Sequence, residues 1–317
     1  MMLKKINFFI GVIIQNLKIL RNWFYRKNIK NLSVGPGAPF DPNVSYRCFD
    51  NLLGYAQDIK KQPNGFYCFQ GYDLWPVKNR SVKPMLKILT LGGSTSDTWS
   101  NNNWPKFLAK ILNENGQSAI IYNGGCGGYA SSQEMLKLIR DIRAIQPTHV
   151  LSYSGINDFV EWVNDDYPMV HLYQKSIAEY LVKESGAFDK WSPGLKSMHH
   201  RAENFLYHGY LMLKASEFIG ARFLQILQPT LGASEKYIFS EREKKMFAKA
   251  GEKYNLDLKA FYSEVRNLCV KENIQYCIDM SDCLNSLTDI FTPDIRHVND
   301  EGNMKIAQEI SERIFNL

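Results

Sequence analysis

Residues 87–96 read KILTLGGSTS, an apolar run that ends in a turn of small residues. A short apolar run bounded by glycines is typical of a strand that is buried on both faces. Four later stretches have the same character and end in polar or small residues: 118–123 (SAIIYN), 148–153 (THVLSY), 222–228 (RFLQILQ) and 274–280 (IQYCIDM). Together with 87–92 they predict five strands.

Helical patterns separate these runs. Residues 104–115 have Pro105 in their first turn, which favours the start of a helix. The next predicted helix should bury an apolar face formed by Met135, Leu138, Ile139 and Ile142. The last predicted helix, at about 301–315, should bury Ile306, Ile310 and Ile314. Strands that alternate with helices predict a parallel sheet covered on both faces. We therefore expect an α/β fold, a flavodoxin-like three-layer α/β/α sandwich with a five-stranded parallel sheet.

Two segments do not follow this alternation. Residues 31–85 are rich in Pro, Gly, Asn and aromatic residues and have little periodicity, so we expect an irregular N-terminal extension. The stretch between the third and fourth strands is too long for a bare crossover and predicts a helical insertion at about 160–220. It contains His199 and His200, which we interpret as surface or lid residues and not as metal ligands.

The basic residues of the chain concentrate at its beginning. Seven of the 38 lie in residues 1–30, where there is no acidic residue: Lys4, Lys5, Lys18, Arg21, Arg26, Lys27 and Lys30. The other 31 nearly balance the 32 acidic residues of the chain. A nucleic-acid interface would spread basic residues over a folded face, so no nucleic-acid partner is expected.

Residues 1–30 also predict an amphipathic helix. Its apolar face carries Ile6, Ile10, Ile13, Leu17, Leu20 and Phe24, opposite a face that bears lysine and arginine. The apolar run Ile6–Ile14 is shorter than the roughly 20 residues of a membrane span. Such a helix suits the headgroup region of an anionic leaflet, but it equally suits packing on the protein's own core or on a partner subunit. Both alternatives remain open.

The six cysteines have no metal-ligand spacing: Cys48, Cys68, Cys126, Cys269, Cys277 and Cys283. No cleavable signal is recognised, so we expect reduced thiols and a cytoplasmic protein, with peripheral contact to the inner membrane surface through residues 1–30 as a further hypothesis.

Chemically active side chains follow the predicted strands. The first strand leads to Ser94, the second to the glycine-rich residues 123–128 (NGGCGG), and the third to Gly155-Ile156-Asn157-Asp158. After the fifth strand, and just before the last helix, comes Asp294-Ile295-Arg296-His297. The carboxyl ends of parallel strands meet at one edge of the sheet, where such folds place their sites. We expect the four segments to meet there.

These residue types are suited to acyl transfer. A serine hydroxyl becomes a good nucleophile when a histidine removes its proton, and a carboxylate on the other ring nitrogen fixes the histidine tautomer. Asp294 and His297 offer that pair from a single loop. The candidates for stabilising the oxyanion of the intermediate are the backbone N–H groups of Ser94 and Gly128 and the side-chain amide of Asn157.

The four segments, in this order and at these strand ends, resemble the conserved blocks of the SGNH (GDSL-like) hydrolases over residues 86–317. The resemblance implies Ser94 as nucleophile, Asp294 and His297 as the D-x-x-H pair, and Ser94, Gly128 and Asn157 as the oxyanion hole. It also implies a reaction that needs no cofactor and no metal. The family's usual Gly-Asp-Ser is here Gly-Gly-Ser, with Gly93 in place of the aspartate.

Single motifs allow other interpretations. Gly125-x-Gly127-x-x-Ala130 fits a dinucleotide-binding pattern after a strand, but the third strand ends in Ser-Tyr-Ser-Gly, with no acidic residue placed to bind a ribose. The absence of G-x-S-x-G argues against the α/β-hydrolase fold. Cys126 is interpreted as a small loop residue and not as a second nucleophile.

The expected function is hydrolysis of acyl esters, with O-acetyl groups on a carbohydrate favoured as substrate. The partner is then a small acyl ester or an acylated glycan. An O-acetyltransferase acting on a glycan, a lipase or a thioesterase, and a membrane-tethered binding protein with a decayed site remain as alternatives. The oligomeric state is left open.

Overall fold

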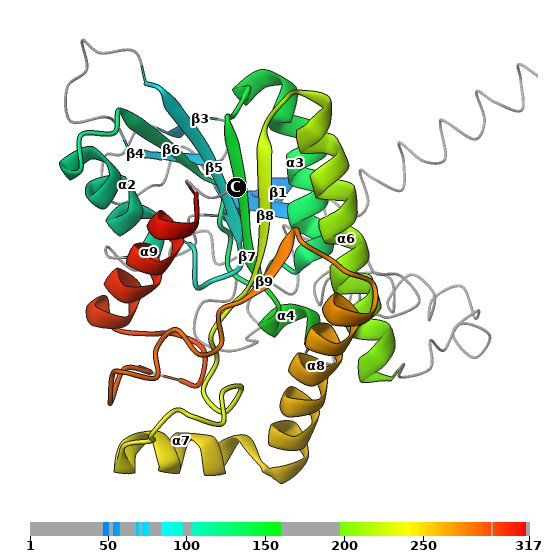
Figure 1. Ribbon diagram of the computed structural model, residues 1–317, viewed down its shortest axis with the longest axis vertical. Coiled ribbons are helices and arrows are strands. Elements are labelled where there is room, and N and C mark those ends of the chain that lie inside the picture. Colours follow the sequence, from blue (N-terminus) through cyan, green and yellow to red (C-terminus); the bar gives the residue numbers. More distant parts are fainter. Residues whose placement is uncertain are drawn as a thin grey trace, which may run out of the picture.

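The computed structural model describes residues 47–50, 53–57, 68–69, 72–75, 84–97, 103–159, 197–292 and 294–314. Its centre is a run of five parallel strands in the order β6-β5-β7-β8-β9 (Figure 1). They are β5 (Leu86–Gly92), β6 (Ala119–Asn123), β7 (His149–Ser154), β8 (Arg222–Leu227) and β9 (Cys277–Asp279). Counted along the chain the order is 2-1-3-4-5, that of flavodoxin-like sheets. The predicted fold class and five parallel strands are confirmed.

Helices cover both faces of the sheet and make the two outer layers. On one face α2 (Trp104–Glu114) packs against α9 (Asp300–Ile314). On the other face α6 (Met198–Phe218) lies between α3 (Ser131–Ile145) and α8 (Glu252–Lys271), as Figure 1 shows. Two more helices, α4 (Ile156–Phe159) and α7 (Glu241–Ala250), follow β7 and β8. Among the helices described, none combines the length and apolar character needed to cross a membrane.

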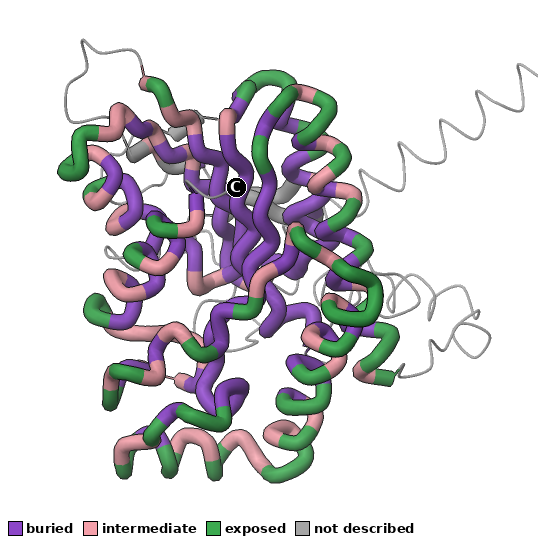
Figure 2. Tube along the Cα trace, viewed as in Figure 1, coloured by how far each residue is buried: buried purple, intermediate pink, exposed green. Residues whose placement is uncertain are grey.

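The strands are buried because helices lie on both sides of them. Ile88, Leu89, Val150 and Leu151 are completely inaccessible to solvent. Figure 2 shows this buried zone running along the sheet, with exposed residues on the outer sides of the helices. The near-continuous apolar runs in the sequence thus reflect burial on two faces.

The segment 31–85 differs from the irregular extension that we expected. It contains four short strands, β1 (Arg47–Asp50), β2 (Gly54–Gln57), β3 (Cys68–Phe69) and β4 (Tyr72–Trp75). β1 and β2 form a separate antiparallel pair, whereas β4 pairs antiparallel with β6 and β3 pairs with β4. Strands of two to four residues are too short to show a period-2 pattern, so they could not be predicted from the sequence.

The buried face of α3 also differs from the prediction. Met135, Leu138 and Ile142 are buried as expected, but Ile139 is 53% exposed and Lys137 is completely buried. The Lys137 ammonium lies 4.3 Å from the centre of the Tyr72 ring. Because β4 brings Tyr72 over this side of α3, the covered face of the helix is shifted away from Ile139.

Two predicted segments lie partly or wholly outside the described residues. These are the amphipathic helix of residues 1–30 and the first part of the insertion, residues 160–196. The rest of the predicted insertion, from Met198 onward, forms α6, which is the helix that connects β7 to β8 across one face of the sheet.

Candidate active site

The structure brings together three residues that are far apart in the sequence. Ser94 lies in the turn after β5, and its Oγ is 2.8 Å from Nε2 of His297, which is 203 residues away. Nδ1 of His297 lies 2.8 Å from Oδ2 of Asp294. The predicted Ser94, Asp294 and His297 therefore form one continuous chain of hydrogen bonds.

The loop before α9 holds the histidine in one orientation. Oδ1 of Asp294 accepts hydrogen bonds from the backbone N–H groups of Arg296 at 2.8 Å and His297 at 3.0 Å. Burial alone would raise the pKa of Asp294, but these bonds and the His297 ring outweigh it and lower the pKa to about 2. Asp294 is thus a carboxylate that accepts the Nδ1 proton, which leaves Nε2 of His297 to take a proton from Ser94.

Buried side chains fix the turn that carries Ser94. The carbonyl oxygen of Ser96 accepts a hydrogen bond from Nδ2 of Asn123 at 2.8 Å, and Oγ of Ser96 accepts one from the Trp104 indole at 2.9 Å. Gly92 must be glycine, because a Cβ there would lie 2.8 Å from the carbonyl oxygen of Tyr153. Asn123 was not among the predicted site residues; the available signal was an asparagine at the end of a predicted strand.

The three predicted oxyanion donors lie on segments that contact one another. Nδ2 of Asn157, on α4, donates to the carbonyl oxygen of Tyr129 at 2.7 Å. The same amide packs on Gly93, where a Cβ would lie only 2.5 Å from Nδ2. Within the described part of the chain, the N–H groups of Ser94 and Gly128 have no hydrogen-bond partner. The arrangement leaves these two N–H groups available beside the amide of Asn157.

The glycine-rich loop after β6 is used to hold the Ser94 turn. The N–H of Cys126 donates to the Gly92 carbonyl at 3.0 Å, and that of Gly127 donates to Oδ2 of Asp97 at 2.7 Å. A Cβ at Gly125 would lie 2.6 Å from the backbone of Ser96. The loop thus packs on the protein itself, and Cys126 is completely buried.

The loop after β8, which was not among the predicted site segments, also contacts the candidate site. Gln228 is 1% exposed, and its Oε1 accepts a hydrogen bond from Thr95 Oγ1 at 3.3 Å. Three residues on, the N–H of Leu231 donates to the carbonyl of Ile295 at 2.8 Å. The loop after β8 therefore joins the residue next to Ser94 to the Asp294–His297 loop.

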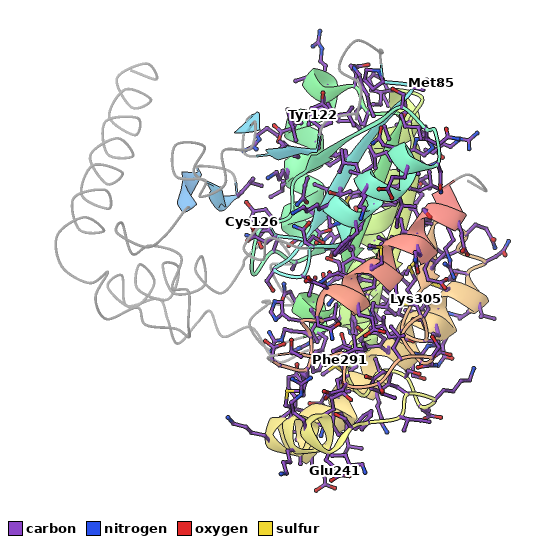
Figure 3. The ribbon with its side chains drawn as sticks, turned by 90° about the vertical axis from the view of Figure 1, so that its left-hand side faces the viewer. Met85, Tyr122, Cys126, Glu241, Phe291 and Lys305 are labelled. Carbon is purple, nitrogen blue, oxygen red and sulfur yellow. The ribbon has the colours of Figure 1, made fainter. Side chains whose placement is uncertain are left out.

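The site lies at the carboxyl ends of the parallel strands. Met85, just before β5, marks one end of the sheet, and Glu241, at the start of α7, lies at the opposite end of the molecule (Figure 3). Cys126 and Phe291, which mark the loops near the site, lie between these two residues in the same view. Ser94, the glycine-rich loop and Asn157 thus follow the carboxyl ends of β5, β6 and β7.

His199 and His200 are both exposed on the first turn of α6. Nδ1 of His199 is 3.1 Å from Glu264, and Nε2 is 3.2 Å from Glu203. Across the described residues, no cluster of three or more His, Cys, Asp or Glu side chains is arranged to hold a metal ion. The interpretation of the two histidines as surface residues is confirmed.

Comparison with known proteins gives similar structures at low identity. No family model and no curated protein matches the chain. Among solved structures, it is similar to the acetyl xylan esterase AlAXEase at 15% identity, covering 72% of this chain and 100% of the other, with a TM-score of 0.46. It is also similar to a putative lipolytic protein of the G-D-S-L family from Desulfitobacterium hafniense DCB-2 (14%, 72% and 98%, TM-score 0.44). A third is the psychrotrophic esterase EstA from Pseudoalteromonas sp. (16%, 72% and 97%, TM-score 0.41).

Proposed function

We propose that this protein is a serine esterase of the SGNH type that acts through an acyl-enzyme on Ser94. The observation that carries the proposal is the pair of 2.8 Å contacts that link Ser94 to His297 and His297 to Asp294. Hydrogen-bonded contact between nucleophile, base and orienting carboxylate is the geometry that nucleophilic catalysis requires.

The first half of the reaction forms the acyl-enzyme. Oγ of Ser94 attacks the ester carbonyl carbon while Nε2 of His297 takes the hydroxyl proton. The tetrahedral intermediate collapses when the C–O bond to the alcohol breaks, and His297 returns the proton to the leaving oxygen. In the second half, water attacks the acyl carbon with His297 again as base, which releases the acid and restores Ser94.

The oxyanion of the intermediate is stabilised by oriented donors. The N–H groups of Ser94 and Gly128 and the Asn157 amide supply them in this proposal. Each such donor contributes on the order of 10²- to 10³-fold in rate. Asn157 is 5% exposed and bonded to Tyr129, so its amide is already oriented before the substrate binds.

For the substrate we propose O-acetyl groups on a carbohydrate. The Gly-Gly-Ser turn departs from the usual family motif, and the sequence shows no long apolar stretch suited to a lid over an acyl chain. An acyl-enzyme can pass its acyl group to a sugar hydroxyl as well as to water, so an O-acetyltransferase remains the nearest alternative. Contact between Ser94 and His297 disfavours a binding protein with a decayed site.

Hydrolysis of p-nitrophenyl esters from acetyl to octanoyl tests the proposal. We expect activity that falls with chain length and drops by at least about 10³-fold in Ser94→Ala. The matched control is Ser286→Ala, an exposed serine that is not among the proposed site residues, which should keep wild-type activity. Equal activity in wild type and Ser94→Ala would contradict the proposal.

The glycan assignment needs its own experiment. Acetate release from acetylated xylo-oligosaccharides is followed with and without an excess of unacetylated oligosaccharide. Free acetate as the main product supports the esterase, and acetylated acceptor as the main product supports the transferase. Activity on p-nitrophenyl acetate but on no acetylated glycan would overturn the carbohydrate assignment alone.

A further inference from the structure

A buried polar cluster lies directly behind the candidate oxyanion site. It consists of Ser131 at the start of α3, Asp158 on α4 and His208 on α6, each no more than 6% exposed. Oδ1 of Asp158 accepts hydrogen bonds from the Ser131 hydroxyl and from the Ser131 N–H, the latter at 3.1 Å. Nδ1 of His208 lies 2.8 Å from Oγ of Ser131.

This cluster fixes the segment that carries Gly128. Asn157 binds the carbonyl oxygen of Tyr129 at 2.7 Å, and the next residue, Asp158, binds Ser131. Asn157 and Asp158, which are consecutive in α4, therefore bind Tyr129 and Ser131 in the segment that runs from Gly128 into α3. Any movement of Ser131 is transmitted to Gly128 on one side and to Asp158 and Asn157 on the other.

The protons of the cluster can be assigned. Ser131 has a single hydroxyl proton, which it gives to Asp158, so its oxygen must accept a proton from His208. Burial lowers the pKa of His208 to about 4, which makes the ring neutral near pH 7. The neutral ring therefore carries its proton on Nδ1 and donates it to Ser131.

No step of the proposed reaction uses this histidine, although it is buried and bonded beside the oxyanion donors. We propose that His208 is a positioning residue that, through Ser131 and Asp158, holds Gly128 and Asn157 in the geometry that stabilises the transition state. This inference rests on the esterase function proposed above. It assigns to α6, the helix between β7 and β8, a part in catalysis that the triad does not show.

Two substitutions of similar size distinguish a positioning role of His208 from a packing role. His208→Asn keeps a hydrogen-bond donor close to the position of Nδ1, whereas His208→Leu fills the same space without a hydrogen-bond donor. Active sites are first titrated with a phosphonate ester, so that kcat refers only to folded, reactive enzyme. We expect His208→Leu to lower kcat by about tenfold, a part of what losing one oxyanion donor costs, with KM little changed. His208→Asn should restore most of this loss.

A purely structural role predicts a different result. It would lower the melting temperature and the titrated fraction of both variants and leave kcat per titrated site at the wild-type value. That outcome, or equal kcat values in His208→Asn and His208→Leu, would overturn the inference. Loss of activity in all proteins including the wild type would instead refute the esterase function.

A second measurement does not depend on activity. Nitrogen NMR of the histidine rings should show His208 as the neutral Nδ1–H tautomer, and the Gly128 amide signal should shift in His208→Leu more than in His208→Asn. An Nε2–H tautomer, or a Gly128 signal that is the same in all three proteins, would contradict the positioning role.

Discussion

Gly93 is the residue whose lack of a side chain allows Asn157 to reach the site. A Cβ at this position would lie 2.5 Å from the Asn157 amide nitrogen and 3.1 Å from the Tyr129 carbonyl oxygen. Real contacts are not that short, so Asn157 would have to move. Gly93, the residue in place of the aspartate of the Gly-Asp-Ser pattern, is therefore also the one against which Asn157, the proposed oxyanion donor, packs.

Gly93→Ala should lower kcat/KM by about 10- to 10²-fold, approaching the effect of removing one oxyanion donor, because the amide of Asn157 is displaced. The measurement is hydrolysis of p-nitrophenyl acetate. Gly116→Ala is the control for a glycine substitution, since Gly116 lies in open space and only its φ of +80° is strained by a side chain. Wild-type kcat/KM in Gly93→Ala would show that Asn157 does not act as proposed.

Asp294 is expected to act as a carboxylate throughout the working pH range. Its pKa is lowered to about 2, so the stability that its ionised form contributes is present above its ordinary pKa of 3.8 and is lost as the pH falls from there towards 2. Asp294→Asn should reduce kcat by roughly 10³- to 10⁴-fold, because an amide no longer selects the Nδ1–H tautomer of His297.

The pH–rate profile of the wild type checks this assignment. Because the pKa of Asp294 is lowered to about 2, the profile should show no step near the ordinary value of 3.8. Asp300→Asn, an exposed carboxylate at the start of α9, is the matched control and should keep the wild-type rate. If Asp300→Asn lost as much activity as Asp294→Asn, the loss would reflect a change in the loop and not the proposed role of Asp294.

At the scale of elements, the junction of α3 and β7 contains a buried acid. Glu134 is completely buried and accepts hydrogen bonds from the hydroxyl groups of Ser152 and Ser154 on β7. Burial raises the pKa of Glu134 to about 8, against an ordinary value of 4.5. Between these values the folded protein holds a proton that the unfolded chain has released, so stability falls as the pH rises.

Glu134→Gln removes this titration. Relative to the variant, the free energy of unfolding of the wild type should fall by up to about 1.4 kcal/mol per pH unit between about pH 5 and 8. Thermal or urea unfolding at several pH values measures the difference. Glu243→Gln is the contrasting control, because its backbone and side-chain hydrogen bonds lower the pKa of Glu243 despite its burial. Its effect should be constant over the same range, and a constant effect for Glu134→Gln would contradict the assignment.

At the scale of the whole molecule, residues 1–30 are proposed as a peripheral membrane contact. The segment has seven basic residues and no acidic one, opposite an apolar face. Deleting it should abolish binding to anionic vesicles and leave hydrolysis of p-nitrophenyl acetate unchanged, because all predicted site residues lie beyond residue 93. Sedimentation with anionic and with neutral vesicles is the measurement. Unchanged binding after the deletion would favour the alternative, packing on the protein or on a partner subunit.

The sequence by itself determined the parallel sheet and indicated the candidate site residues Ser94, Asp294 and His297. Buried strands need apolar runs, and glycines or chemically active residues follow them at the strand ends, so both signals are local. The five predicted strands match β5 to β9, most of them within a residue or so at each end. Ser94, Asp294 and His297 could be proposed because each lies in a short block of recognisable type.

Only the tertiary structure decided which other residues surround these blocks. The burial of Lys137 and exposure of Ile139 depend on β4, a four-residue strand with no pattern of its own. The contacts of Gln228 with Thr95, and of His208 with Ser131, join positions 133 and 77 residues apart. A sequence pattern records the periodicity of one element, whereas these contacts depend on which elements pack together, and that is fixed only when the whole chain folds.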